Sequence, residues 1–242
     1  MQDPGQTEAA QTQEKVVKDE DKKEKEAIKE SGPTAPFKDQ PGLRRALSLV
    51  IDRERLTKAV TGLGEAPAYG WVPRGTANYT PQQFDYAGWP YAERVAEARR
   101  LYAEAGYSAQ RPLQVEIRYN QGEVHGRLAV AIAAMWKEAL GVETTLYAEE
   151  FRALLHTDFG INLTGYSNPR YDALLEQATR QPDPARRRAL LEEAERLMLA
   201  DHPVLPLYFY VNKHLVKPYV TGWSDNVMNA QYSKDLDLGA DR

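Results

Sequence analysis

Residues 91–146 alternate between helical and strand patterns, and this rhythm limits the chain to an α/β fold. The segments 91–105 and 126–140 repeat apolar residues at helical spacing, and a glycine follows each of them. The segments 113–117 and 142–146 alternate apolar and polar residues, as half-buried strands do. Strands that are separated by helices favour a sheet covered by those helices. The sequence therefore predicts an α/β domain with a mixed sheet flanked by helices.

Further helices are predicted on both sides of this unit. Residues 43–63 carry one apolar helical face, in which Asp52 can cap a second helix turn. Helical patterns return at 171–178 and at 184–200. The apolar run VLPLYFYV then predicts a buried strand at 204–211, followed by a tail of short strands and loops.

Residues 1–35 differ from the rest of the chain, because they are rich in Gln, Glu, Lys and Asp and hold almost no large apolar residues. Such a segment cannot bury enough apolar surface to offset the entropy lost on ordering. We expect a disordered or solvated charged arm, and an arm that binds a partner is the alternative. The chain then divides into this arm, an α/β lobe at 36–211 and a tail at 212–242.

Charge and composition exclude several classes of function. The net charge of −4 gives no basic excess for binding nucleic acid. No stretch of about 18 apolar residues exists, so no membrane span is expected. The absence of cysteine excludes disulfides, thiolate metal sites and a cysteine nucleophile. The first residues do not show the basic-then-apolar pattern of a signal peptide, so we expect an exported form to have its leader removed or replaced.

The sequence also lacks the short motifs of common catalytic and metal sites. It holds no HExxH, GxSxG, P-loop or GxGxxG pattern. Its 4 histidines are scattered along the chain, which is weak support for a metal site. We therefore expect neither enzymatic activity, nor a metal ion, nor any cofactor.

Six segments after Pro36 carry a resemblance to a known family. They are PFKDQPGLRRALSLVIDRERL at 36–56, APAYGWVP at 66–73, EARRLYAEAGY at 97–107, MWKEALGVETTL at 135–146, GYSNPRYDALL at 165–175 and LPLYFYVNKHLVKPYVTGW at 205–223. In this order they are similar to segments of the periplasmic oligopeptide-binding proteins, the solute receptors of peptide ABC importers. Together they cover nearly everything after Pro36.

The resemblance implies one half of a two-lobed periplasmic-binding-protein fold. In this family, crossover strands join two lobes that enclose a peptide between them. Residues 36–205 match the second lobe, and the tail after Lys213 matches the return to the first lobe, which we expect to be largely absent. A second departure is an internal gap near residue 158, where the family carries an arginine and an acidic residue for the charged groups of the peptide.

The resemblance also assigns four candidate peptide-binding residues. His125 matches a histidine that meets the carboxyl end of certain peptides, and beside free helix N–H groups it could receive a carboxylate. The alternative is a surface histidine in the first helical turn. Glu150 and Phe151 match an acidic and an aromatic pocket residue, and Tyr210 matches a tyrosine on the crossover strand. Core packing is the alternative for Phe151 and Tyr210.

Two functions of different classes remain open. The first is a truncated peptide-binding solute receptor of an ABC importer, periplasmic, with short peptides as ligands and the importer permease as partner. The second is a non-transporting structural or interaction protein derived from such a receptor. Its partner would bind the aromatic loop 69–89 or the charged arm, since aromatic residues are enriched at protein interfaces. The alternative for the loop is that its aromatic side chains cover the core of the lobe itself.

Overall fold

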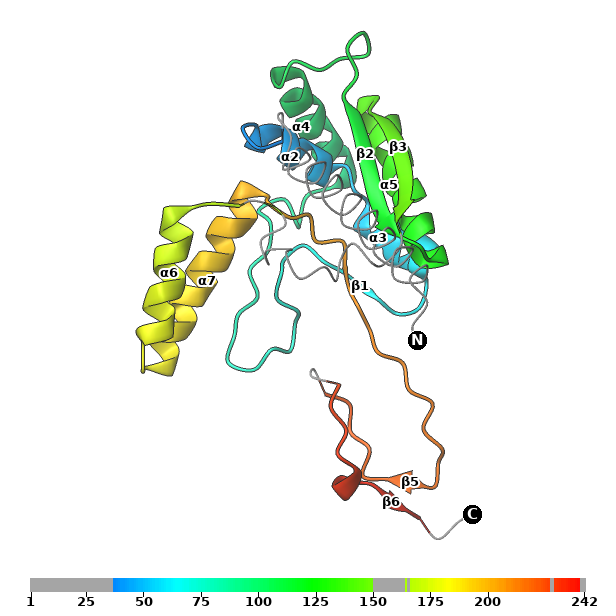
Figure 1. Ribbon diagram of the computed structural model, residues 1–242, viewed down its shortest axis with the longest axis vertical. Coiled ribbons are helices and arrows are strands. Elements are labelled where there is room, and N and C mark those ends of the chain that lie inside the picture. The colour runs from blue at the N-terminus through cyan, green and yellow to red at the C-terminus, as the bar shows by residue number, and fades with distance from the viewer. Residues whose placement is uncertain (1–36, 150–163, 165, 227–228, 240–242) are drawn as a thin grey trace, which may run out of the picture.

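The computed structural model describes residues 37–149, 164, 166–226 and 229–239, which form a body, a helical hairpin and an extended tail (Figure 1). The elements in chain order are α2 (Pro41–Leu49), α3 (Arg53–Arg55), the π-helix η1 (Leu56–Thr61), β1 (Ala66–Pro67), α4 (Tyr91–Glu104), β2 (Gln114–Asn120), α5 (Glu123–Leu140), β3 (Glu143–Glu149), α6 (Pro169–Arg180), α7 (Pro184–Asp201), β4 (Tyr208–Phe209), β5 (Val220–Thr221), the 3₁₀ helix η3 (Ser233–Asp235) and β6 (Asp237–Leu238). The body extends from α2 to β3, the hairpin is α6 and α7, and the tail follows β4.

The α/β rhythm of the body is confirmed as one β–α–β unit. β2 and β3 pair in parallel, from Gln114 opposite Glu143 to Asn120 opposite Glu149. The helix α5 connects the two strands and packs against both, because a parallel pair needs such a crossover. The mixed sheet that we predicted is divided: in the described part of the chain the strands form three separate pairs, of which β2–β3 is parallel and β1–β4 and β5–β6 are antiparallel.

The core of the body lies between α2, α4 and α5. The apolar residues predicted for the first helix are buried there: Leu43, Ala46, Leu47, Val50 and Ile51. Trp136 of α5 packs in this core, and its Nε1 donates to the carbonyl oxygen of Leu47 at 3.0 Å. The predicted apolar face ends earlier than expected, because η1 closes at Gly62 and Leu63 is 57% exposed.

Two side-chain caps begin the helical hairpin. Asn168 accepts hydrogen bonds from the backbone N–H groups of Arg170 and Tyr171 at the start of α6. Asp183 accepts one from the N–H group of Arg186 at the start of α7. Such caps satisfy donors that have no partner inside the helix. The two predicted helices are therefore confirmed, and they pack on each other while projecting from the body (Figure 1).

Two arginines near the start of the body fix the later part of the chain. The guanidinium of Arg44 in α2 donates to the carbonyl oxygens of Asp201 and His202 at the end of α7. Arg53 in α3 has no exposed surface, and its Nε donates to the carbonyl oxygen of Pro206 at 2.8 Å. Both contacts join residues more than 150 positions apart. They set the path of the crossover segment from α7 to the tail.

The predicted buried strand at 204–211 is wrong in extent and in burial. Only Tyr208–Phe209 pairs with β1, and the side chains of the segment are half-buried or exposed. Pro206 offers no N–H group to a strand ladder, and the partner strand β1 ends at Pro67. The chain leaves the body directly after β4, since the side chain of Tyr210 is 73% exposed.

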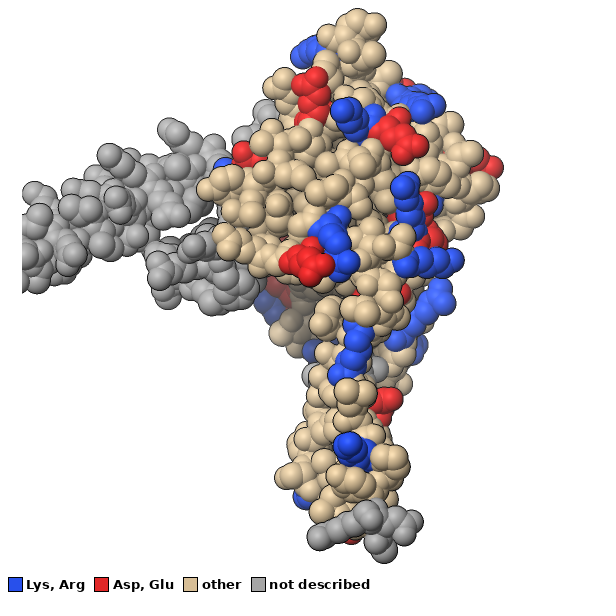
Figure 2. All heavy atoms as spheres, turned by 90° about the vertical axis from the view of Figure 1, so that its right-hand side faces the viewer, with Lys and Arg blue, Asp and Glu red and all other residues tan. Residues whose placement is uncertain are grey.

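The tail extends from the body as a narrow arm that ends in the β5–β6 pair (Figures 1 and 2). Lys213 fixes its start to the body through an ion pair with Glu65 at 3.1 Å. Figure 2 shows a face of the body on which basic and acidic side chains are interspersed. Large apolar side chains of the tail are exposed: Leu215, Val216, Tyr219, Tyr232 and Leu238. None of the described helices is long and apolar enough to cross a membrane.

His202 ends α7 in a left-handed conformation and is almost completely buried. Its φ is 51° and its exposed fraction is 2%. The ring stacks on Phe84 with 4.7 Å between centroids, and Nδ1 lies 2.9 Å from the carbonyl oxygen of Ala200, to which its N–H donates. Burial lowers the pKa of His202 to about 4, because the cation would lose its hydration.

We expect the protein to lose stability as the pH falls from about 6.5 towards about 4. The unfolded chain binds a proton on this histidine near pH 6.5, whereas the folded chain keeps it neutral down to about pH 4. The free energy of unfolding is therefore highest above pH 6.5 and falls by up to about 3 kcal/mol below it. Urea denaturation between pH 7.5 and 4 measures this slope.

The matched control is His202→Asn, because asparagine tolerates left-handed backbone and does not titrate. We expect this variant to be less stable at neutral pH but to have a flatter pH profile between 6.5 and 4. An unchanged slope in the variant would show that other groups cause the acid sensitivity.

Candidate ligand-binding groove

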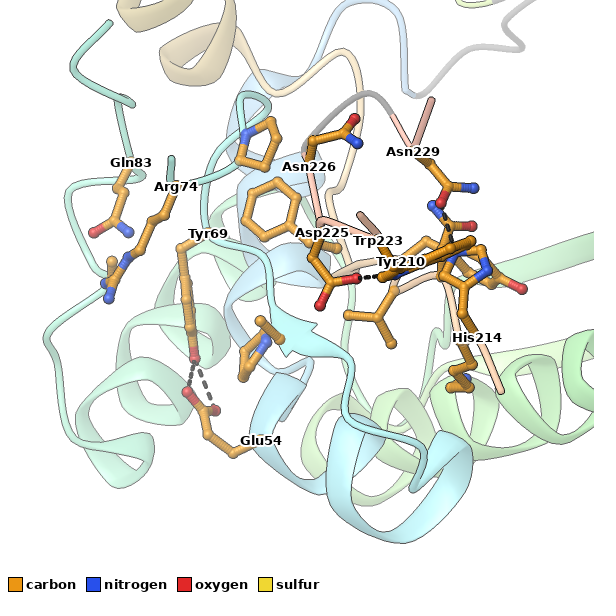
Figure 3. A pocket seen from close by; sticks show the side chains of 18 of the residues that line it. Glu54, Tyr69, Arg74, Gln83, Tyr210, His214, Trp223, Asp225, Asn226 and Asn229 are labelled. Carbon is orange, nitrogen blue, oxygen red and sulfur yellow. Dashed lines mark hydrogen bonds between the residues drawn. The ribbon is translucent and has the colours of Figure 1, made fainter. Parts of the chain in front are cut away.

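An open groove lies where the chain leaves the body, between the loop after β1 and the first part of the tail (Figure 3). Its volume is about 1140 Å³, which is enough for a ligand of the size of a short peptide. The residues labelled in Figure 3 are Glu54, Tyr69, Arg74 and Gln83 from the body and Tyr210, His214, Trp223, Asp225, Asn226 and Asn229 from the tail side. Because the two walls are distant in sequence, the groove depends on the pairing of β4 with β1.

A fixed hydrogen bond defines part of the body wall. The hydroxyl of Tyr69 lies 2.9 Å from each carboxylate oxygen of Glu54 and donates to this group. The guanidinium of Arg94 lies 3.8 Å from the same carboxylate. Burial and the hydrogen bond to Glu54 raise the pKa of Tyr69 to about 12. The phenol therefore stays protonated at neutral pH and holds this carboxylate in place.

The loop at 70–82 is fixed by one buried carboxylate of α7. Glu195 is 6% exposed and accepts four hydrogen bonds from the loop. The donors are the backbone N–H groups of Trp71, Val72 and Gln82, at 3.0–3.2 Å, and the hydroxyl of Tyr79, at 2.6 Å. The loop closes tightly at Gly70, where a Cβ atom would lie 1.9 Å from the carbonyl oxygen of Gln82. The groove thus has one wall whose backbone is held by a charged acceptor.

Aromatic and amide side chains form the tail wall. The Nε2 atom of His214 lies 2.6 Å from Oδ1 of Asn229, and the imidazole ring contacts the indole of Trp223 at 4.8 Å between centroids. The indole N–H of Trp223 donates to Asp225 at 3.2 Å. This wall therefore offers ring faces, amides and one carboxylate to a ligand (Figure 3).

The four predicted site residues are not brought together in the described structure. Tyr210 lines the groove, and its 73% exposure excludes the core-packing alternative for this residue. His125 is exposed in the first turn of α5 and is not among the residues that line the groove. Glu150 and Phe151 lie outside the described residues. Their roles, like that of His125, stay predictions.

The groove contains residues that sequence patterns did not single out. Among them are Arg74 on the loop and Trp223 and Asp225 on the tail. The loop carries clustered prolines and aromatics, which are typical of irregular structure, and Trp223 ends the last segment of the family resemblance. Neither feature predicts that the loop and the tail line the same groove. Within the described ranges, no group of three or more His, Asp or Glu residues could hold a metal ion.

The aromatic loop 69–89 mainly covers the body. This was the alternative to its prediction as a partner surface. Tyr69 and Phe84 are buried, and Tyr86 has no exposed surface. Trp71 and Trp89 differ, because 58% and 36% of their surfaces are exposed. A partner surface on this loop would therefore have few aromatic side chains to offer.

The fold is part of a periplasmic-binding-protein fold. The solved structure of OppA from Burkholderia pseudomallei superposes with a TM-score of 0.73 and 32% identity, over 85% of this chain and 47% of that one. The protein-family model described as bacterial extracellular solute-binding proteins, family 5 Middle, matches residues 3–183 of the sequence. The chain belongs to this family of solute-binding proteins. The resemblance to oligopeptide-binding proteins is confirmed.

Two curated relatives from Escherichia coli K12 show what the chain shares with longer proteins. The periplasmic murein peptide-binding protein MppA is 32% identical over 86% of this chain and 43% of its own length. The probable deoxycholate-binding periplasmic protein YgiS is 33% identical over 85% of this chain and 44% of its own length. The chain thus spans less than half the length of these relatives. The family match starts at residue 3, within the segment whose composition predicts a charged arm.

We expect Glu195→Ala to loosen the loop that forms the body wall. The change leaves three backbone N–H groups and one hydroxyl without their charged acceptor, so the free energy of unfolding should fall by about 2–4 kcal/mol. Hydrogen exchange of residues 71–82 should become faster. Arg187→Ala is the matched control, because Arg187 is an exposed residue of the same helix. Equal exchange rates in both variants would contradict the role of Glu195.

Proposed function

We propose that this chain is the peptide-binding second lobe of a solute receptor of an ABC importer, truncated relative to its relatives. The observation that carries this proposal is the groove between the loop after β1 and the first part of the tail, in a chain of the solute-binding family. The murein peptide-binding relative supports peptides as the ligand class. The family description and the periplasmic relatives support a location outside the cytoplasm. The importer permease as partner follows from the resemblance and is part of the proposal.

In this proposal residues 36–211 form the second lobe and the tail at 212–242 returns to a first lobe. The exposed apolar side chains of the tail support this division. Leu215 is fully exposed and Leu238 is 60% exposed, although the removal of such side chains from water is favourable. The relatives extend well beyond the part that matches this chain. In this proposal the corresponding part of the receptor covers the exposed side chains of the tail.

The chemistry of the groove fits a ligand with amide groups and variable side chains. Aromatic faces at Tyr210 and Trp223 give apolar contact, and the side-chain amides of Gln83 and Asn226 can pair with peptide groups. Water that fills an open groove allows different side chains to be accepted. The open side also keeps the local dielectric constant high, which weakens each charged contact.

We expect weak but measurable peptide binding by this chain alone. Isothermal titration with a mixture of tri- to pentapeptides should give a dissociation constant near the millimolar range, which corresponds to about −4 kcal/mol. Tyr210→Ala, a change in the groove, should weaken the binding, whereas Arg127→Gln, an exposed change on α5 outside the groove, should not. No heat above that of buffer at millimolar peptide would count against the proposal. Heat with deoxycholate and not with peptides would instead place the chain beside its deoxycholate-binding relative.

The alternative is a non-transporting interaction protein, which the exposed apolar residues of the tail favour. It predicts association through the tail that peptides do not change. Light scattering after size exclusion should then show a mass above that of the monomer for the unmodified chain. The double variant Leu215→Asp and Leu238→Asp should elute as a monomer. A chain that is strictly monomeric and captures no partner in pull-down experiments would eliminate this alternative.

A further inference from the structure

We propose that Arg74 receives a carboxylate group of the ligand in the groove, so that the site selects peptides by a free carboxylate. The inference rests on the proposed peptide-binding function and names the residue that sets its selectivity. Arg74 follows Pro73 on the loop between β1 and α4, and its side chain lines the groove (Figure 3).

The charged groups of the groove single out this arginine. Two other basic residues line it, and both have partners: Lys213 pairs with Glu65 at 3.1 Å, and His214 shares a hydrogen bond with Asn229. Among the described residues, no ion pair or hydrogen bond engages the guanidinium of Arg74. Of the three basic side chains that line the groove, that of Arg74 is therefore available to an anion.

The backbone of Arg74 is held on both sides. The hydroxyl of Thr76 donates to the carbonyl oxygen of Pro73 at 2.9 Å, which closes the turn around Arg74. The flanking positions of the loop are fixed by the hydrogen bonds to Glu195, including that of Val72 at 3.0 Å. A guanidinium on a fixed loop loses less freedom on binding than one on a mobile segment.

The acidic groups of the groove are already engaged or lie on other parts of the wall. Glu54 accepts from Tyr69, and Asp225 accepts from the indole of Trp223. In Figure 3 Arg74 and Glu54 lie on the body side of the groove and Asp225 lies on the tail side, and the charge of Glu54 is offset by Arg94 at 3.8 Å. A ligand anion is repelled by these carboxylates and attracted to Arg74, whereas a ligand ammonium group is favoured near Asp225. This separation of charge suits a zwitterionic peptide.

A carboxylate is the anion that this geometry favours within the proposed ligand class. The planar guanidinium presents paired donors that match the two carboxylate oxygens. In a peptide the group comes either from the C-terminus or from an acidic side chain. Because the groove is open to water, we expect the contact to change affinity by about tenfold and no more.

The test compares three peptides of otherwise equal sequence: a free acid, its C-terminal amide, and an amide that carries one aspartate. The probe is the full chain, titrated with each peptide by calorimetry. We expect the free acid to bind about tenfold more tightly than the plain amide. We expect Arg74→Gln to remove this difference and Arg74→Lys to retain part of it. The matched control is Arg187→Gln, an exposed arginine on α7, which should leave the difference unchanged.

Each outcome has one meaning. If the aspartate-bearing amide binds as tightly as the free acid, a side-chain carboxylate also serves; if it binds like the plain amide, the C-terminal carboxylate is the group received. Peptide binding without a preference for carboxylates, or a preference that survives Arg74→Gln, overturns the inference but leaves the proposed function intact. An unmodified chain that binds none of the three peptides overturns both. Circular dichroism of the variants checks that these exposed substitutions leave the fold intact.

Discussion

The buried guanidinium of Arg53 joins the parts of the chain on which the groove depends. It donates to the carbonyl oxygen of Pro206 at 2.8 Å and to the carbonyl and hydroxyl oxygens of Ser48 at 3.0 Å. The ring of Tyr69 lies 4.9 Å from its central carbon. Burial lowers the pKa of Arg53, yet a guanidinium stays charged in proteins, so these oxygens and the ring must replace its hydration. The crossover segment, the end of α2 and the start of the loop are thereby held around one side chain.

Local patterns predicted the elements whose contacts are close in sequence. The helices α4, α5 and α7 and the strands β2 and β3 follow from periodicity, and Gly141 ends α5 with a φ of 74°, where glycine is favoured. The strand expected at 204–211 failed because its extent depends on β1, more than 140 residues earlier. Composition also gave no sign that Arg53 and Glu195 are buried, since charged residues are mostly solvated. Only their contacts with residues distant in sequence show that Arg53 and Glu195 are buried and hold the fold together.

The candidate site was predictable only where the family resemblance reaches it. Tyr210 was placed near the ligand by its match to the crossover strand, and it does line the groove. Arg74 stood in no recognised pattern, because its place in the groove follows from the hydrogen bonds of Glu195 to the loop and from the β1–β4 pairing. His125 follows the carboxyl end of β2. The end of β3 at Glu149 lies at the same edge, because Asn120 of β2 pairs with Glu149. Ligands of α/β folds bind outside the carboxyl ends of strands, so this edge remains compatible with its predicted role.

Buried charges that bond to the backbone hold the loop of the body wall and the crossover segment from which the tail starts. Glu195 fixes the loop wall, and Arg53 fixes the segment from which Tyr210 emerges. Rigid walls reduce the entropy lost when a ligand binds, but they do not exclude water. The groove is open to water, and large apolar side chains of the tail are exposed. In the proposed function, affinity then comes from a few directional contacts, among them the contact with the guanidinium of Arg74 on its fixed loop.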